Sequence, residues 1–145
     1  MAIEAAQIAR GGTAYAIEMD PEDHQLIAAN VQRFGVTNLK PVLGQAPEAW
    51  KDLPTPDAVF VGGAGRAVAR IAEQAYQQLK PGGRIVVNVN SVENVAAVRE
   101  VLHAASGDAA VRMVQISRGV HQLERMRFEA LNPTFLITAV KPAVK

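Results

Sequence analysis

Two acidic residues close a short apolar segment near the start of the chain and offer oxygen atoms to a nucleotide. The segment Tyr15-Ala16-Ile17-Glu18 ends on Glu18, and Asp20-Pro21 follows it. In α/β sheets that bind nucleotides, an acid at the carboxyl end of the second strand accepts hydrogen bonds from the ribose hydroxyls. Asp20 already has a local role as a helix N-cap before Pro21. We therefore interpret Glu18 as a ribose acceptor; the alternative is a solvent-facing acid favoured by the helix dipole.

Two loops that follow apolar segments offer backbone groups to a ligand. Gly62-Gly63-Ala64-Gly65 comes after the run 57–61, and glycines there let backbone N–H groups approach a ligand closely. The loop matches neither the G-x-G-x-x-G pattern nor a P-loop lysine motif, so it predicts no phosphate site. A tight strand-to-helix turn is the alternative. Gln45-Ala46 offers a side-chain carbonyl and a backbone N–H to a heterocycle, or is simply a loop.

Basic side chains gather in the late part of the chain and near the glycine loop. They are Arg66, Arg118, His121, Arg125 and Arg127. Such a group would suit a substrate with several carboxylates through charge-assisted bidentate contacts. A solvated positive face is the commoner explanation. His121 and Glu129 offer an acid–base pair, although a lone histidine in a loop is more often a surface residue. We see no metal-ligand spacing and no order of serine, histidine and aspartate for nucleophilic catalysis.

The elements that must position these residues alternate between strands and helices. Strands are expected at 13–19, 39–43, 57–61, 84–89, 110–117 and 134–140. Helices are expected at 1–10, from Pro21 to Gly35, from Val68 to Leu79 and from Ser91 to Gly107, with a brief turn at Ala49-Trp50. This alternation predicts an α/β fold with a parallel sheet and helices on both faces. The last two strands have no helical pattern between them and should form an antiparallel pair at the edge.

The carboxyl ends of the expected strands define one rim, where ligands of open α/β sheets bind. That rim would consist of the segments 18–20, 44–46, 62–65 and 88–90. Candidate residues from separate parts of the chain therefore converge on one expected site.

Length and composition restrict the class of protein. The chain has 145 residues, 49% of them apolar and 20% charged, with a net charge of +1 and no cysteine. This suits one domain with a hydrophobic core, without disulfides or zinc–thiolate sites. No apolar run approaches the roughly 20 residues that span a bilayer, and the first residues are not a signal peptide. We expect a cytoplasmic domain with neither a nucleic-acid nor a membrane partner.

Several segments together resemble a known enzyme class, the class I S-adenosylmethionine-dependent methyltransferases. They are Tyr15-Ala16-Ile17-Glu18 with the helix after it, Leu79-Lys80-Pro81-Gly82-Gly83 and the closing antiparallel strand. Over essentially the whole chain, the sequence is more narrowly similar to the decarboxylating precorrin methyltransferases of cobalamin biosynthesis. This family includes the carboxyl-terminal domain of precorrin-6Y C5,15-methyltransferase. The narrower resemblance is carried by Ile3-Glu4-Ala5-Ala6, Ala9-Arg10-Gly11-Gly12, Asp20-Pro21-Glu22, Gly44-Gln45-Ala46-Pro47-Glu48-Ala49, Phe60-Val61-Gly62-Gly63-Ala64-Gly65, Ser117-Arg118-Gly119 and Glu129-Ala130-Leu131-Asn132-Pro133.

The resemblance implies methyl transfer from S-adenosylmethionine to C15 of a corrin precursor, with loss of the acetate carboxylate at C12. It assigns cofactor contacts to Glu18, Met19, Gln45, Ala46, Gly62 and Gly63. Family members usually carry aspartate where Gln45 stands. For the acidic arms of the substrate, Asn88 and Arg118 are the hypotheses, and no residue is assigned as a general base. The resemblance also implies a homo-oligomer, such as a tetramer.

The resemblance places a central first strand and a glycine-rich cofactor loop before Ile3, whereas this sequence begins at Met1. We therefore expect a single methyltransferase domain over residues 1–145 that lacks those elements and leaves two strand edges unpartnered. Such a chain alone would bind S-adenosylmethionine weakly or not at all. The alternatives are a non-catalytic remnant or subunit, and a methyltransferase for another small molecule or RNA. A nicotinamide dehydrogenase shares the ribose-binding acid, but Lys80-Pro81-Gly82-Gly83 and the antiparallel last strand argue against it.

Overall fold

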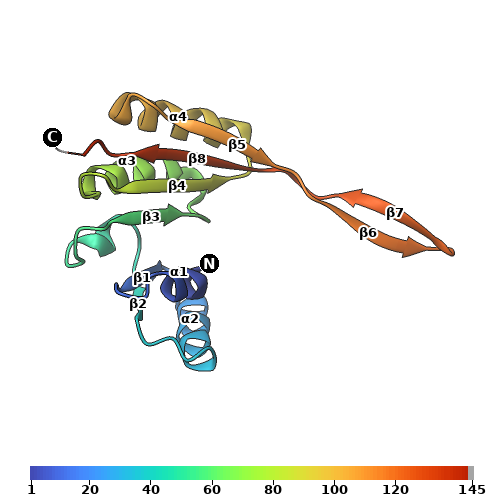
Figure 1. Cartoon of the computed structure of the whole chain (residues 1–145), viewed down its shortest axis with the longest axis horizontal. Coiled ribbons are helices and arrows are strands. Elements are labelled where there is room, and N and C mark those ends of the chain that lie inside the picture. The colour runs from blue at the N-terminus through green and yellow to red at the C-terminus, as the bar shows by residue number, and fades with distance from the viewer. Residues whose placement is uncertain (144–145) are drawn as a thin grey trace. The chain divides into compact units, whose positions relative to one another are not determined.

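The chain forms two compact units, Met1–Pro54 and Thr55–Lys145. Figure 1 shows a computed structural model of the chain, which describes residues 1–143. In each unit, a pair of parallel strands ends at a common edge.

The first unit is built on a parallel pair of strands. Its elements are α1 (Ala2–Ile8), β1 (Ala14–Glu18), α2 (Pro21–Arg33), β2 (Leu39–Leu43) and the 3-10 turn η1 (Glu48–Trp50). The register runs from Ala14 opposite Leu39 to Glu18 opposite Leu43. The Gly44 N–H then donates to the Glu18 carbonyl at 2.9 Å. Both strands therefore end at the same level, as the sequence predicts.

Local signals in the sequence account for the ends of α2 and the position of α1. The Asp20 side chain accepts hydrogen bonds from the backbone N–H groups of Glu22 at 2.8 Å and Asp23 at 3.2 Å, which makes it the N-cap of α2. Gly35 ends the helix at a φ of +61°. The Asn38 amide donates to three carbonyls at the end of α1 and just beyond it, those of Ala6, Ala9 and Gly12.

The second unit is built on a mixed sheet. Its elements are β3 (Ala58–Val61), η2 (Gly65–Ala67), α3 (Val68–Gln78), β4 (Arg84–Val89), α4 (Val92–Ser106), β5 (Ala110–Val114), β6 (Ser117–Gln122), β7 (Arg125–Ala130) and β8 (Thr134–Val140). The sheet order is β3-β4-β8-β5. β3 and β4 are parallel, and β8 runs antiparallel to both of its neighbours. The predicted α/β class and the antiparallel strands at the carboxyl-terminal end are confirmed.

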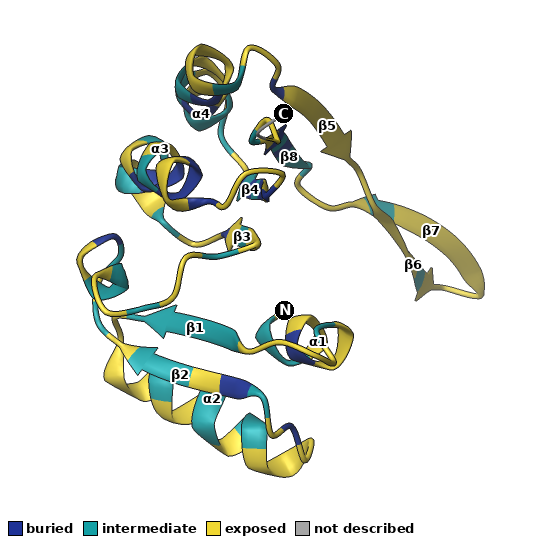
Figure 2. Ribbon diagram, turned by 60° about the vertical axis from the view of Figure 1, so that its left-hand side comes forward, coloured by how far each residue is buried: buried dark blue, intermediate teal, exposed yellow. Residues whose placement is uncertain are grey.

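The core of the second unit lies between the sheet and two helices. The apolar stripe predicted for the helix after the glycine loop is buried throughout: Val68, Ile71, Ala72, Ala75, Tyr76 and Leu79. Ile85 and Val87 of β4 are fully buried beneath it. Figure 2 shows α3 and α4 on the same side of this sheet. The Tyr76 hydroxyl donates to the Val140 carbonyl at 3.4 Å, and burial raises the pKa of this hydroxyl.

The segment 118–133, expected to be a loop, folds as an antiparallel ribbon of β6 and β7. This corrects two predictions, because β5 ends at Val114 and Ser117 already belongs to β6. Figure 1 shows the ribbon extending beyond the ends of β5 and β8. Its turn residues Leu123 and Glu124 both have positive φ, at 47° and 61°. Hairpin turns of this kind are usually marked by Asn-Gly, so the sequence carried no turn signal.

β3 is not the buried strand that its apolar sequence predicts. Within the described residues of the second unit it pairs with β4 alone. Phe60 is 43% exposed, and of its four residues Val61 alone is buried. A strand with a single neighbour keeps one edge open, which explains the exposure.

Candidate functional site

In the first unit, the candidate ribose acceptor is held in a fixed orientation. Glu18 is the last residue of β1, and its Oε1 atom accepts a hydrogen bond from the backbone N–H of Asp20 at 3.0 Å. No second bond to this carboxylate is present within residues 1–143. Oε2 is therefore available to a ligand at the carboxyl end of the strand. The contact to Asp20 also belongs to the local turn, so both interpretations of Glu18 remain compatible with the geometry.

The other candidates of the first unit lie at the same edge. Met19 follows Glu18 directly and is 67% exposed. Gln45 and Ala46 follow β2, whose last residue, Leu43, is opposite Glu18. The structure thus brings together the predicted cofactor contacts of this unit, and Gln45 is exposed while Ala46 is half-buried.

In the second unit, the glycine loop and the end of β4 border one pocket of about 180 Å³. It is lined by the loop residues 63–65 and by three asparagines, Asn88, Asn90 and Asn94. Val61 is opposite Val87, so Gly62 and Asn88 follow at the same level of the parallel pair. Among the described residues, no charged side chain lines this pocket. It is a neutral, polar site rich in amide groups.

Two glycines of the loop show why larger residues would not serve there. Gly63 has a φ of +68°, in the left-handed region that side chains disfavour. A Cβ on Gly62 would lie 3.0 Å from the Phe60 ring. The loop therefore keeps its backbone open to an approaching ligand.

Thr134, the first residue of β8, completes the pocket and was missed by the sequence reasoning. Its hydroxyl donates to Oδ1 of Asn88 and lies 3.2 Å from the Val89 carbonyl. Asn94 was also missed; its backbone N–H donates to the hydroxyl of Ser91, the N-cap of α4. Thr134 could have been found only with the strand register, since Thr134 and Asn88 are 46 positions apart in sequence, whereas Asn94 lies in the first turn of the helix that follows β4.

Arg118 does not join Asn88 in this pocket. Its guanidinium lies 3.5 Å from the Glu129 carboxylate on the opposite strand of the ribbon, and Arg127 lies 2.6 Å from the same carboxylate. Arg125, opposite Gln122, has the same orientation, so the three arginines share one face. The proposed acid–base pair is wrong, because His121 is opposite Met126 on the other face. Arg66 lies apart from the ribbon, in η2.

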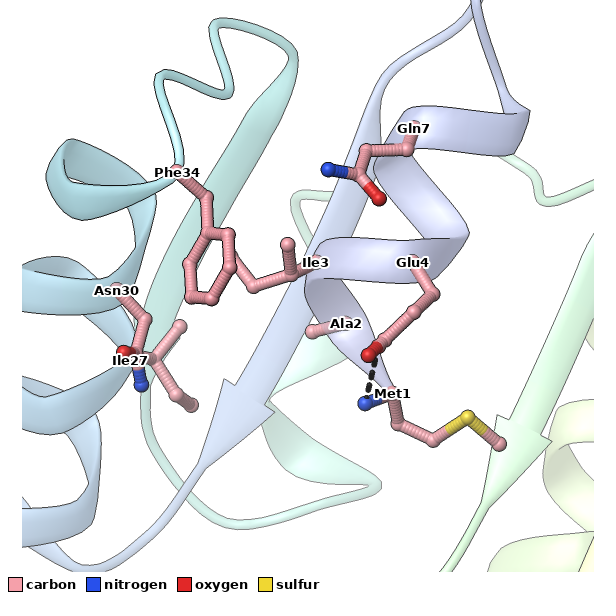
Figure 3. Close-up of a pocket in the computed structure, with 8 residues that line it drawn as sticks. All are labelled: Met1, Ala2, Ile3, Glu4, Gln7, Ile27, Asn30 and Phe34. Atoms are coloured by element: carbon pink, nitrogen blue, oxygen red, sulfur yellow. Dashed lines mark ion pairs between the residues drawn. The ribbon is translucent and has the colours of Figure 1, made fainter.

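A separate pocket in the first unit contains none of the predicted site residues. It measures about 330 Å³ and lies between α1 and α2, with Ile3, Ile27 and Phe34 on its walls (Figure 3). The Met1 ammonium is 2.5 Å from the Glu4 carboxylate at its rim, and this hydrogen bond lowers the pKa of Glu4. The pocket adds no chemistry to the candidate site.

Residues 1–143 contain no cluster of three or more histidine, cysteine, aspartate or glutamate side chains that could hold a metal ion. None of their helices has the length and apolar character needed to cross a membrane.

Comparison with known proteins decides the family. The model of the precorrin methyltransferase domain matches residues 1–141. The chain belongs to this family. As a precorrin methyltransferase domain it is expected to have the α/β sheet described above, and the resemblance inferred from the sequence motifs is confirmed.

Curated and solved relatives agree with the family match. A probable cobalt-precorrin-6B C(15)-methyltransferase (decarboxylating) of Pyrobaculum calidifontis is 34% identical over 96% of this chain and 72% of its own length. The crystal structure of precorrin-6y C5,15-methyltransferase from Geobacter metallireducens superposes with a TM-score of 0.87 at 32% identity, covering 96% of this chain and 74% of that one. The precorrin 8w decarboxylase of Methanobacterium thermoautotrophicum gives a TM-score of 0.80 at 32% identity, covering 88% and 69%.

Proposed function

We propose that the chain methylates C15 of a precorrin with S-adenosylmethionine as the methyl donor, and that the acetate at C12 loses its carboxylate. The observation that carries this proposal is the family match over residues 1–141. The relative from Pyrobaculum calidifontis, named for the decarboxylating C15 reaction, supports the position and the coupled loss of carbon dioxide.

The residues at the edge of the first unit suit the adenosine part of the cofactor. The free Oε2 of Glu18 would accept from the ribose hydroxyls, because Oε1 is already engaged. Met19, the Gln45 side-chain carbonyl and the Ala46 backbone would contact the adenine side. Gly62 and Gly63 would border the methionine end, where their lack of side chains permits close approach.

The proposed chemistry asks little of the protein beyond positioning. When bound, S-adenosylmethionine supplies a methyl group on a positively charged sulfur that is already activated for transfer. The chain's own residues would orient the ring carbon and exclude water, which can account for much of a rate enhancement. We therefore assign no general base.

The acidic arms of a precorrin would be held by neutral and charged donors. Asn88 offers an amide inside the pocket, and Arg118 offers a guanidinium on the ribbon. Arg125 and Arg127 share the face of Arg118 and would add to the attraction for carboxylates. Replacing Arg118 by alanine should raise the apparent KM for the tetrapyrrole, and an unchanged KM would reject this role.

The test of the proposed function compares two acids near the start of α2. Because weak cofactor binding is expected for this chain, it is incubated with a high concentration of S-adenosylmethionine and with a precorrin. Mass spectrometry follows the gain of one methyl group and the loss of one carbon dioxide. Glu18→Gln should raise the KM for S-adenosylmethionine roughly tenfold to a hundredfold, the size expected for hydrogen bonds to a charged group. Glu22→Gln, an exposed acid in the first turn of α2, is the matched control and should leave it unchanged.

We also propose that the chain is a homo-oligomer whose contacts include the face of the ribbon opposite to its three arginines. Met126 and Phe128 lie on that face, 57% and 73% exposed. A Cβ on Gly119 would lie 3.1 Å from the Met126 sulfur, so both side chains cover the glycine. A second copy of the chain offers an identical face with the same two apolar side chains. Burying these side chains against each other favours association, and a tetramer is the assembly we propose.

Sedimentation tests this assembly. The double change Met126→Ser and Phe128→Ser should lower the oligomeric state or weaken association. Val92→Ser on α4 is the control, because Val92 is also 73% exposed. A chain that sediments as a monomer before any change, or a double variant that keeps its oligomeric state, would contradict the role of this face.

A further inference from the structure

The end of β4 contains an amide whose orientation is set by a neighbouring strand. Asn88 is half-buried and lies opposite Leu136 in the antiparallel pairing of β4 with β8. Thr134 is two residues before Leu136 and projects from the same face of β8. Its hydroxyl donates to Oδ1 of Asn88. The carbonyl end of this amide is therefore occupied.

The other end of the amide is open to the pocket. Nδ2 of Asn88 makes no hydrogen bond within the described residues. No side-chain nitrogen or oxygen there is both buried and without a partner, so this nitrogen is accessible. Asn88 lines the pocket of about 180 Å³ beside Gly63 and Asn94. At Asn88, a ligand in the pocket would therefore meet an N–H donor rather than a carbonyl oxygen.

We propose that Thr134 is a positioning residue that fixes the Asn88 amide with its NH₂ group facing the pocket, where it donates to a carboxylate of the tetrapyrrole. This inference rests on the proposed function, because it takes the acidic arms of a precorrin as the ligand. The hydroxyl matters because an amide turned by a half-rotation would present its oxygen instead, and an oxygen repels a carboxylate.

In the competing arrangement, Thr134 accepts a hydrogen bond from the Asn88 amide instead of donating one to it. The Thr134 hydroxyl lies 3.2 Å from the Val89 carbonyl, which can only accept. If the single hydroxyl proton were donated there, the threonine oxygen would accept from Nδ2 and the Asn88 oxygen would face the pocket. The two arrangements predict opposite responses to a carboxylate at position 88, which makes them separable.

Three variants of the whole chain test the proposal. Thr134→Val removes the hydroxyl at similar volume, Thr134→Ser keeps it, and Asn88→Asp replaces the donor by an acceptor. The Kd of the precorrin is measured by calorimetry, KM and kcat by turnover, and folding by thermal unfolding. Thr134→Val should raise Kd and KM roughly fivefold with kcat nearly unchanged, the effect of one lost neutral hydrogen bond. Thr134→Ser should restore both, and Asn88→Asp should weaken binding by at least tenfold.

Each remaining outcome contradicts the role of Thr134. If Thr134→Val binds like the unchanged chain, or if Thr134→Ser is as weak as Thr134→Val, the hydroxyl does not act through Asn88. If Asn88→Asp keeps full affinity, the amide presents its oxygen instead. Should Thr134→Val unfold, Asn88→Asp still shows which end of the Asn88 amide faces the pocket, and full affinity of that variant would still overturn the proposal. If precorrin binds but no methyl group is transferred, the proposed reaction fails while the calorimetric test of Thr134 remains valid.

Discussion

β4 and the ribbon of β6 and β7 show two ways in which one unit presents polar groups. In β4, Ile85 and Val87 are fully buried, and Asn88 stands at the end of that anchored strand. In the ribbon, most residues are exposed, and two of its arginines, Arg118 and Arg127, are held by one shared carboxylate, Glu129. A group on β4 is therefore fixed by the core, whereas a group on the ribbon is fixed only by its cross-strand neighbours. We infer that β4 holds its polar group in a fixed position, whereas the ribbon provides charged side chains and a surface for contacts.

The largest expected difference between the two regions is in core packing. Ile85→Ala should lower the free energy of unfolding by about 3 kcal/mol, because it leaves a cavity under α3. Phe128→Ala, in an exposed side chain of the ribbon, should change that energy by no more than about 0.5 kcal/mol when measured on the dissociated chain. Urea unfolding of both variants measures the contrast. Equal losses would show that the ribbon has a packed core of its own.

A pair of glycines gives the next largest effect. A Cβ on Gly83, just before β4, would lie 2.8 Å from the Lys80 carbonyl and 3.1 Å from that of Asp57. Both are backbone atoms, so Gly83→Ala should cost about 1–3 kcal/mol. On the ribbon, a Cβ at Gly119 would meet the flexible end of Met126, and Gly119→Ala should be nearly neutral. Thermal unfolding of the two variants would reject the comparison if Gly83→Ala proved as stable as Gly119→Ala.

The smallest expected effect concerns the charged face of the ribbon. Glu129 contacts Arg118 and Arg127, and all three side chains are at least 35% exposed. Glu129→Gln should lower the free energy of unfolding by less than about 1 kcal/mol, since exposed ion pairs contribute little. The difference should shrink further in 1 M salt, where charges are screened. A large loss that salt does not reduce would mean that this carboxylate has a structural role.

The same contrast explains what the sequence could predict. The helix α3 and the strand β4 bury one side, so their apolar spacing predicted both, and Asp20 and Ser91 marked helix starts through their capping role. In the ribbon, β7 alternates charged and apolar residues from Arg125 to Ala130, a period-two strand signal that the sequence reasoning missed, whereas β6 shows no such alternation. The turn of the ribbon at Leu123 and Glu124 also lacks the residues that usually accompany positive φ.

Sequence reasoning could predict those residues of the candidate site that lie at the carboxyl ends of strands, but not the residue that depends on pairing between distant strands. Glu18, Gln45, Gly63 and Asn88 were found because each follows an apolar segment that ends abruptly. Thr134 was not found, because its position beside Asn88 depends on an antiparallel register that local sequence does not encode. The assignments of these residues to the cofactor and substrate remain predictions.

The most direct test of the proposed function is a measurement of product stoichiometry. The chain is supplied with S-adenosylmethionine labelled in its methyl group and with a precorrin labelled in the C12 acetate carboxylate. We predict that labelled methyl enters the tetrapyrrole and labelled carbon dioxide is released in equal amounts, and that Glu18→Gln slows both together. A folded chain that binds both the precorrin and S-adenosylmethionine but produces neither label, or only one of the two, would contradict the proposed function.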